Sequence, residues 1–450
     1  MSLSPTAPLS RSTLLAFASP AFVIALPTIP VYLYLPTMYG VDMGLGLAAT
    51  GALLLLARLF DTVTDPLIGY VSDRWPVHGL RRKPWILIGA GLAGFGLIML
   101  LDPPPGADGF YLLTWSMTLY AGWTMVAVPY MAWGAELHQD YNERTRITGW
   151  RESLALLGVV GAGGLAAYVT ETASAAAAPS FVAWAAVGLG LIFIPVLLFL
   201  VPEDASYSKP NPQRLRQLNS LFGNRLFLRL LSAWFINGLA NGIPAALFFL
   251  YLEHGLGVTE DLRPRFILIY FVAAIAAIPL WLRLSRSIGK HRSWCWAMIL
   301  ACAAFAVVPA LPTGAEIAFM LICILTGAAL GADLALPPAI QADVADYDRW
   351  RFSADRTGIQ FALWGMATKL ALATAVGLAL PGVTWMGFDP ELPTEVGRSA
   401  LIVIYAGLPV VIKAVAIMVI WRFPLDARRH MALSRRLKQR LTLQSPGDNR

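Results

Sequence analysis

The segment Arg58-Leu-Phe-Asp-Thr-Val-Thr-Asp-Pro-Leu-Ile-Gly-Tyr-Val-Ser-Asp-Arg-Trp75 places charged side chains inside a stretch that is otherwise apolar. Arg58, Asp61 and Asp65 are spaced i, i+3 and i+7, so on a helix their side chains share one face. Charges inside membrane helices are costly, and they usually face a bundle interior or a water-filled cavity, where they pair or bind ions. The segment therefore predicts a membrane helix whose charged face points inward.

The composition of the whole chain agrees with a membrane protein. Of its 450 residues, 57% are hydrophobic and 14% are charged, and the mean hydropathy of +0.62 is too high for a soluble enzyme. A helix needs about 20 apolar residues to cross the hydrocarbon core. The sequence predicts twelve such runs, with approximate bounds 12–36, 44–72, 84–102, 110–137, 149–170, 180–201, 227–252, 264–285, 294–312, 316–340, 358–384 and 399–422.

The sequence holds no pattern typical of an enzyme or of a tightly bound cofactor. Cys295, Cys302 and Cys323 lie in apolar runs without metal or redox spacing. The five histidines are scattered, and Gly289-Lys290 lacks the remainder of a phosphate-binding loop. We therefore expect no catalytic activity and no cofactor other than a coupling ion.

The basic residues predict how the chain is oriented. Lys and Arg concentrate in loops that stay in the cytoplasm, and here they concentrate after the even-numbered runs, whereas the opposite loops hold Arg263, Arg265 and Arg398. Both termini are therefore predicted to be cytoplasmic in a multi-pass protein of the inner membrane, expected to be a monomer. The net charge of +7 fits this topology and contact with anionic lipid, and it does not indicate nucleic-acid binding.

A coarse internal repeat divides the chain into two halves. The loop Gly79-Leu-Arg-Arg-Lys-Pro-Trp has a weaker counterpart in Gly289-Lys-His-Arg-Ser-Trp. Two six-helix halves describe the major facilitator architecture, in which rocking of the halves exposes a central site to each side in turn. The predicted division is an N-terminal half, a cytoplasmic linker, a C-terminal half and a basic cytoplasmic tail, at residues 1–201, 202–225, 226–422 and 423–450.

Several motifs resemble those of the glycoside–pentoside–hexuronide:cation symporters, the melibiose permease family. Arg58-Leu-Phe-Asp-Thr-Val-Thr-Asp-Pro followed by Arg82-Lys-Pro-Trp is similar to the signature of that family, and the similarity extends over nearly the whole chain. Further matching positions are Val128-Pro-Tyr, Glu143-Arg-Thr-Arg, Ala342-Asp-Val-Ala-Asp-Tyr and Lys369. The resemblance implies an all-α membrane protein of the major facilitator fold, with 12 transmembrane helices, that couples solute transport to Na⁺ or H⁺.

The charged face of run 44–72 is the candidate cation site. Asp61 and Asp65 carry more negative charge than Arg58 can balance, and a bound cation would neutralise the surplus. Hard cations require several oxygen ligands, so Thr64 and Thr124 are added as hydroxyl ligands, the second because the family supplies one at that place. The alternative interpretation is that Arg58 neutralises the acids in an ion network that only supports helix packing.

Other charged residues have predicted roles in charge balance and gating. Lys369 lies deep in run 358–384 and needs an anionic partner, which Asp61, Asp65 or Asp333 would supply. Asp333 either pairs with Lys369 or binds substrate. Lys413 is interpreted as a boundary residue on a lipid-facing helix. The residues predicted to gate, as a cytoplasmic ionic latch, are Asp73, Arg74, Arg81 and Arg82.

The resemblance is weakest at the substrate site. Galactoside-transporting members use two aspartates and an arginine, and only the arginine, Arg151, is present here, while the two acidic positions fall near Pro20 and near Ala127. Aromatic and amide side chains would suit a sugar ring or an amphiphilic anion equally, although each one also suits ordinary packing. The further substrate-binding candidates are Trp123, Tyr130, Asn237, Asn241, Gln360 and Trp364.

The sequence therefore predicts a cation-coupled secondary transporter of a small organic solute, with a sugar or glycoside as the leading expectation. A lipid or lysolipid carrier of the same fold is the alternative, because the acidic sugar-binding pair is missing. A membrane receptor or scaffold without transport activity is a third possibility, against which the buried charged face argues.

Overall fold

The computed structural model describes most of the chain, and helices joined by short loops make up the described part. Within that part no residue forms a strand. The described residues are 8–28, 30–35, 38–75, 80–172, 177–203, 223–259, 262–352, 356–388 and 394–443.

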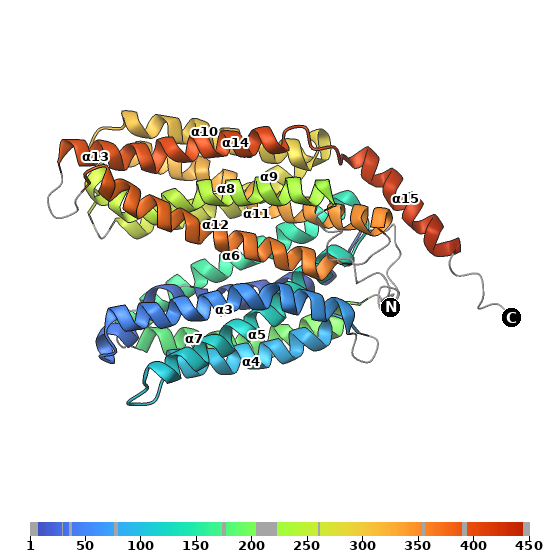
Figure 1. Ribbon diagram of the computed structural model, residues 1–450, viewed down its shortest axis with the longest axis horizontal. Helices are drawn as coiled ribbons and strands as arrows, with labels where there is room; N and C mark the ends of the chain where they lie inside the picture. The colour runs from blue at the N-terminus through green and yellow to red at the C-terminus, as the bar shows by residue number, and fades with distance from the viewer. Residues whose placement is uncertain are drawn as a thin grey trace. The chain divides into compact units, whose positions relative to one another are not determined.

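The chain forms two compact units (Figure 1). The first contains residues 1–215 with 353–365, and the second contains 216–352 with 366–450. The first unit holds α1 Arg11–Ala25, η1 Pro30–Tyr34, η2 Met38–Asp42, α3 Leu47–Arg74, α4 Lys83–Leu101, α5 Gly109–Glu136, α6 Tyr141–Thr172, α7 Ala178–Leu200 and the start of α12 Thr357–Trp385. The second holds α8 Arg225–Leu250, η6 Tyr251–Leu256, α9 Arg263–Ile288, α10 Lys290–Val307, η7 Val308–Ala310, α11 Glu316–Phe352, the rest of α12, α13 Glu395–Ile402, η8 Val403–Gly407, α14 Leu408–Ile420 and α15 Ala427–Leu443.

Each of the twelve predicted runs coincides with one helix or with consecutive helical segments. The first run comprises α1 and η1, the seventh comprises α8 with the start of η6, and the last comprises the α13, η8 and α14 series. Among the described residues, nine helices are long and apolar enough to cross a membrane, and α1 is a shorter apolar helix. The prediction of an all-α membrane protein is confirmed.

Small residues allow helices of the first unit to approach closely. A Cβ atom on Gly122 of α5 would lie 2.4 Å from the main-chain nitrogen of Ala93 in α4, and one on Gly158 of α6 would lie 2.2 Å from the carbonyl oxygen of Phe22 in α1. Lipid offers no hydrophobic drive for helix association, so close backbone packing of this kind supplies the contact.

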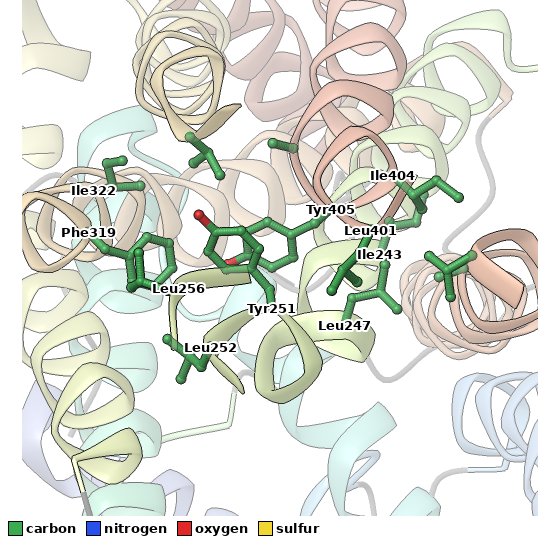
Figure 2. Packing of buried hydrophobic residues seen from close by; sticks show 14 of the residues in the cluster. Ile243, Leu247, Tyr251, Leu252, Leu256, Phe319, Ile322, Leu401, Ile404 and Tyr405 are labelled. Carbon is green, nitrogen blue, oxygen red and sulfur yellow. The ribbon is translucent and has the colours of Figure 1, made fainter. Parts of the chain in front are cut away.

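The core of the second unit contains a cluster of stacked aromatic side chains (Figure 2). Tyr251 and Tyr405 stack with ring centroids 4.2 Å apart and an interplanar angle of 5°, and Phe319 packs against both rings. These residues come from η6, η8 and α11, so the cluster joins three segments that are far apart in the sequence. In contrast, large apolar side chains such as Phe199 and Leu191 are exposed, as expected for surfaces that face lipid.

Most of the predicted linker, but none of the predicted domain borders, lies where the structure gives no description. The linker 202–225 falls largely on residues 204–222, which are outside the described part. Residues 353–365 belong to the first unit, whereas the sequence places them in the C-terminal half. This difference arises because the start of α12 contacts α3, as described below. The basic tail forms α15 as far as Leu443.

Candidate functional site

The two acids of the charged face in α3 converge on one hydroxyl group of α5. Thr124 Oγ1 lies 3.0 Å from Asp61 Oδ1 and 2.7 Å from Asp65 Oδ1. The three side chains are buried, with residue exposures of 5% for Asp61, 3% for Asp65 and 2% for Thr124. The charged face therefore points inward, as its spacing predicts.

The Thr124 hydroxyl lies within hydrogen-bonding distance of both carboxylates. A hydroxyl carries one proton, so it can donate to only one acceptor at a time. The other carboxyl oxygen then faces a lone pair of Oγ1 at 3.0 Å or less. That second contact becomes favourable when the carboxyl is protonated and donates, or when a cation binds to all three oxygens. The arrangement is thus chemically suited to hold a proton or a hard cation.

Arg58 and Thr64 flank the two acids on α3. The Arg58 guanidinium carbon lies 5.3 Å from the centroid of the Tyr120 ring, which is cation–π geometry. The Thr64 hydroxyl donates to the main-chain carbonyl of Asp61 at 3.0 Å. The structure therefore directs the hydroxyl of Thr64 toward the backbone of its own helix, and that of Thr124 toward the carboxylates.

Asp73 binds the N-terminus of α12 within the first unit. Its carboxylate accepts the main-chain N–H groups of Gly358 and Ile359, each at 3.0 Å. A carboxylate in this position satisfies free N–H groups and interacts favourably with the helix dipole. A Cβ atom on Gly358 would lie 2.5 Å from Asp73 Oδ1, so the contact requires glycine at that position.

The same carboxylate belongs to a buried ion network. Asp73 Oδ1 lies 3.2 Å from Nη2 of Arg81 and 2.8 Å from Nη2 of Arg82. Arg82 Nη2 also pairs with Glu136 Oε1 at 2.6 Å, and Glu203 accepts the main-chain N–H groups of Arg81 and Arg82 at 2.6 and 2.7 Å. Three of the four predicted gating residues thus meet in one buried cluster.

The fourth predicted gating residue has a different environment. Arg74 is exposed, and its guanidinium contacts the hydroxyl and the ring of Tyr70. Sequence reasoning also missed Glu136 and Glu203. In the sequence each is simply a carboxylate at or just after the end of an apolar run. At such a position the sequence does not show whether the carboxylate pairs with a buried group or faces solvent.

A second buried polar cluster lies in the second unit, around Asp333 of α11. Trp294 Nε1 donates to Asp333 Oδ1 at 2.6 Å, and Asn241 Nδ2 donates to Asp333 Oδ2 at 2.9 Å. Lys413 Nζ lies 3.6 Å from Asp333 Oδ2, and it donates to the side-chain oxygens of Asn237 and Asn241 at 2.7 Å each. Helices α8, α10, α11 and α14 are linked through this cluster.

The structure corrects the interpretation of Lys413 as a boundary residue. Its exposure is 3%, because the two asparagines of α8 and the aspartate of α11 surround its ammonium group. Helix α14 is apolar at nearly every other position, so the sequence did not show which of its faces is buried. Lys369, predicted to pair with Asp61, Asp65 or Asp333, is half-buried in the part of α12 that belongs to the second unit.

The remaining substrate candidates lie in varied environments. Tyr130 is buried and its hydroxyl donates to the Phe17 carbonyl oxygen at 2.5 Å, and Arg151 pairs with the neighbouring Glu152. Trp123 lines an apolar pocket of about 420 Å³ among α1, α4, α5 and α7. Gln360 and Trp364 are both buried in the segment of α12 that belongs to the first unit. Asn237 and Asn241 lie in the second unit, whereas Trp123, Tyr130, Gln360 and Trp364 lie in the first.

A pocket of about 310 Å³ lies within the second unit and has one polar end. Asn241, Asp333 and Lys413 form that end. The walls are largely aromatic and aliphatic and include Phe248, Tyr270, Phe271, Phe305, Phe319 and Tyr405. A ligand that fits this shape carries a polar group at one end of an apolar body.

Comparison with known proteins identifies the family. The model of the family described as MFS/sugar transport protein matches residues 16–427. The chain is 25% identical to the putative glycoside/cation symporter YagG of Escherichia coli (strain K12), over 88% of this chain and 87% of that protein. It is 22% identical to the sodium-dependent lysophosphatidylcholine symporter 1-A of Danio rerio, over 84% of this chain and 79% of that protein.

A solved structure supports the fold. The outward-conformation crystal structure of the major facilitator superfamily transporter FucP superposes with a TM-score of 0.67, over 92% of this chain and all of that one. The sequence identity is 12%, so this likeness concerns the fold alone. The fold is the major facilitator fold.

The Asp333 cluster predicts strong thermodynamic coupling between Asp333 and Lys413. Lys413→Met leaves a buried carboxylate without its cation, and we expect the unfolding free energy to fall by about 3–5 kcal/mol. Asp333→Asn alone leaves the buried ammonium and should also destabilise. In the double variant neither charge remains, so its loss should be clearly smaller than the sum of the single losses. Thermal denaturation in detergent measures the stability of the wild type, the two single variants and the double variant. Additive losses would contradict the pairing.

Proposed function

The chain belongs to the MFS/sugar transport protein family, and we propose that it is a cation-coupled symporter that moves a small organic solute by alternating access. Members of this family are transporters rather than enzymes. One observation carries the proposal: Thr124 lies within 3.0 Å of both Asp61 and Asp65 in a buried site. We further propose an inner-membrane location, cytoplasmic termini and a monomeric state.

The proposed coupling follows from the charge of this site. Two buried carboxylates repel each other and resist burial in a medium of low dielectric constant. A bound Na⁺ or H⁺ reduces that cost, so the cation stabilises the conformation in which the site is closed. A solute that binds the same conformation therefore binds more tightly when the cation is bound. By the same coupling free energy, the cation binds more tightly when the solute is bound. Arg58 and Lys369 are proposed to balance the charge when the cation leaves.

The leading substrate class is a sugar or glycoside, supported by the name of the Escherichia coli relative. In this proposal Arg151 binds the solute as a planar multidentate donor, with Trp123, Tyr130, Gln360 and Trp364 as further contacts. The alternative is an amphiphile such as a lysolipid, and the apolar pocket that ends at Asp333 and Lys413 supports it. Asn237 and Asn241 would serve that alternative by holding the Lys413 ammonium group toward the polar end.

We also propose a gating role for the Asp73 network. Asp73 links the end of α3 to the start of α12 and to the loop arginines, Arg81 and Arg82. Hydrogen bonds to a charged group contribute about 1.5–3 kcal/mol each, so breaking a few of them is a barrier of the size expected for a transport step. Arg74 is exposed beside Tyr70 at the same end of α3, and we assign it a supporting role in this gate.

The cation site predicts that coupling and solute binding can be separated. Asp61→Asn and Asp65→Asn should each abolish cation-driven accumulation in proteoliposomes, because neither variant can offer two carboxylates to the ion, while some downhill exchange remains. Thr124→Val should weaken the cation dependence.

Thr62→Val is the matched control, since the Thr62 hydroxyl donates to the carbonyl oxygen of Arg58 in the same helix, at 2.9 Å. Uphill accumulation at the wild-type level in both asparagine variants would exclude this site. A protein that moves no solute from a panel of sugars, glycosides and lysolipids would instead be a receptor or scaffold.

The substrate class predicts the effect of changing Arg151. Arg151→Lys retains one charge but loses the planar fork of five donors, so uptake of a sugar or glycoside should fall roughly tenfold or more while the amount of folded protein is unchanged. Uptake of radiolabelled solutes measures this effect, with lysophosphatidylcholine tested in parallel. Unchanged uptake kinetics in the variant would assign Arg151 a structural role through Glu152.

The proposed gate predicts the effect of a single methyl group. Gly358→Ala places a Cβ atom 2.5 Å from Asp73 Oδ1, so the carboxylate must move and the uptake rate should change roughly tenfold, as expected for the loss of about one charge-assisted hydrogen bond from the closed gate. Gly377→Ala in the same helix is the control, because its Cβ has nothing within 4 Å. If both variants take up solute at the wild-type rate, the Asp73 contact has no role in gating.

A further inference from the structure

A second pocket in the second unit is unrelated to the buried Asp333 cluster. It has a volume of about 600 Å³ and lies where the α9–α10 connection meets the segment between α14 and α15. Five arginines and one aspartate contribute to its wall, namely Arg286, Arg292, Arg422, Arg428, Arg429 and Asp426. The pocket wall therefore carries a marked surplus of positive charge.

The one acidic residue of the pocket already accepts a hydrogen bond from within the protein. Asp426 Oδ1 accepts the main-chain N–H of Arg429 at 2.8 Å and so caps the start of α15. The five arginine side chains are exposed. A guanidinium group binds phosphate oxygens with paired N–H donors and stays charged at any physiological pH. An anion in this pocket would meet donors from both sides.

The buried imidazole of His291 is a second, independent feature of the same pocket. His291 lines the pocket and is 6% exposed. Its Nδ1 atom has no hydrogen-bond partner among the described residues. A buried polar atom without a partner is costly, and an anion with its own proton or a water bound beside it would satisfy this nitrogen. His291 is the second residue of α10. The free main-chain N–H groups at this helix N-terminus also favour negative charge.

The helix that carries two of the arginines is fixed in place. Figure 1 shows α15 extending beyond the end of α14. On α15, His430 is buried and its Nε2 lies 3.2 Å from Asp346 Oδ2 in α11, and Leu433 is also buried. Arg428 and Arg429 lie on the exposed side of the same helix, and the Arg429 guanidinium donates to the carbonyl oxygen of Pro424 at 2.6 Å.

The position of the pocket suits a group at the membrane surface. Trp421 lines it directly after the end of α14, and its ring centroid lies 6.5 Å from that of Trp296. Tryptophan is enriched where the membrane meets water. We propose that this pocket binds a phosphate group, either as the headgroup of an anionic phospholipid or as part of a soluble phosphate compound.

The test compares two paired variants of the full-length protein in detergent. Arg422→Gln/Arg428→Gln removes two charges from the pocket, and Arg435→Gln/Arg436→Gln removes two exposed charges from α15 outside it. The probes are dioleoylphosphatidylglycerol, dioleoylphosphatidylcholine, glycerol 3-phosphate and inorganic phosphate. Binding is measured by native mass spectrometry and by the shift of the thermal denaturation midpoint.

We expect an anionic probe to bind the wild-type protein and the Arg435/Arg436 variant, and to lose affinity for the pocket variant roughly tenfold or more, since juxtamembrane arginines bind anionic surfaces strongly. Loss of phosphatidylglycerol binding alone identifies the lipid as the source, and a parallel loss for glycerol 3-phosphate or inorganic phosphate identifies a soluble ligand. Equal binding by both double variants, or no binding by any anionic probe, would overturn the proposal. Arg292→Gln, on the other side of the pocket, repeats the test if the double variant does not fold.

Discussion

The cost of a charge in a medium without water is the constraint on which this structure depends. An unpaired carboxylate or ammonium group in hydrocarbon is so unfavourable that each one must find a partner inside the helix bundle. The charges within the described spans follow this rule: Asp61 and Asp65 meet Thr124, and Lys413 meets Asp333. Helix packing through glycine contacts brings these side chains together, and the polar clusters then hold the helices in register.

The two units satisfy this constraint in different ways. In the first unit, two buried acids share one hydroxyl, that of Thr124. In the second, one acid and one lysine are surrounded by two asparagines and a tryptophan, which satisfy both charges within the protein. The first cluster has the oxygen-rich chemistry of the cation site proposed above. The second cluster has that of a fixed element, or of the polar end of a substrate pocket.

Buried polar networks are also found at the ends of the helices. The Asp73 cluster joins α3, the start of α12 and the following loop, while Asp346 and His430 hold α15 against α11. Such contacts cross between elements that are remote in sequence, so they couple the position of one helix end to that of another. A transport cycle requires contacts of this kind that form and break at modest cost.

The sequence by itself determined the class of protein, the number of apolar runs and the inward direction of the charged face on α3. These features are local: hydropathy over about 20 residues and the i, i+3, i+7 spacing are readable without any tertiary contact. Partner choice was not readable in this way. Thr124, which the sequence suggested only through the family resemblance, is 63 residues from Asp61, and Gly358 is 285 residues from Asp73. The helices that carry such partners are apolar on nearly every face, so periodicity cannot show which face is buried. Only the tertiary structure decided that Lys413 is buried beside Asp333, that Thr64 bonds its own backbone and that Gly358 accommodates Asp73, because each depends on side chains brought together by helix packing.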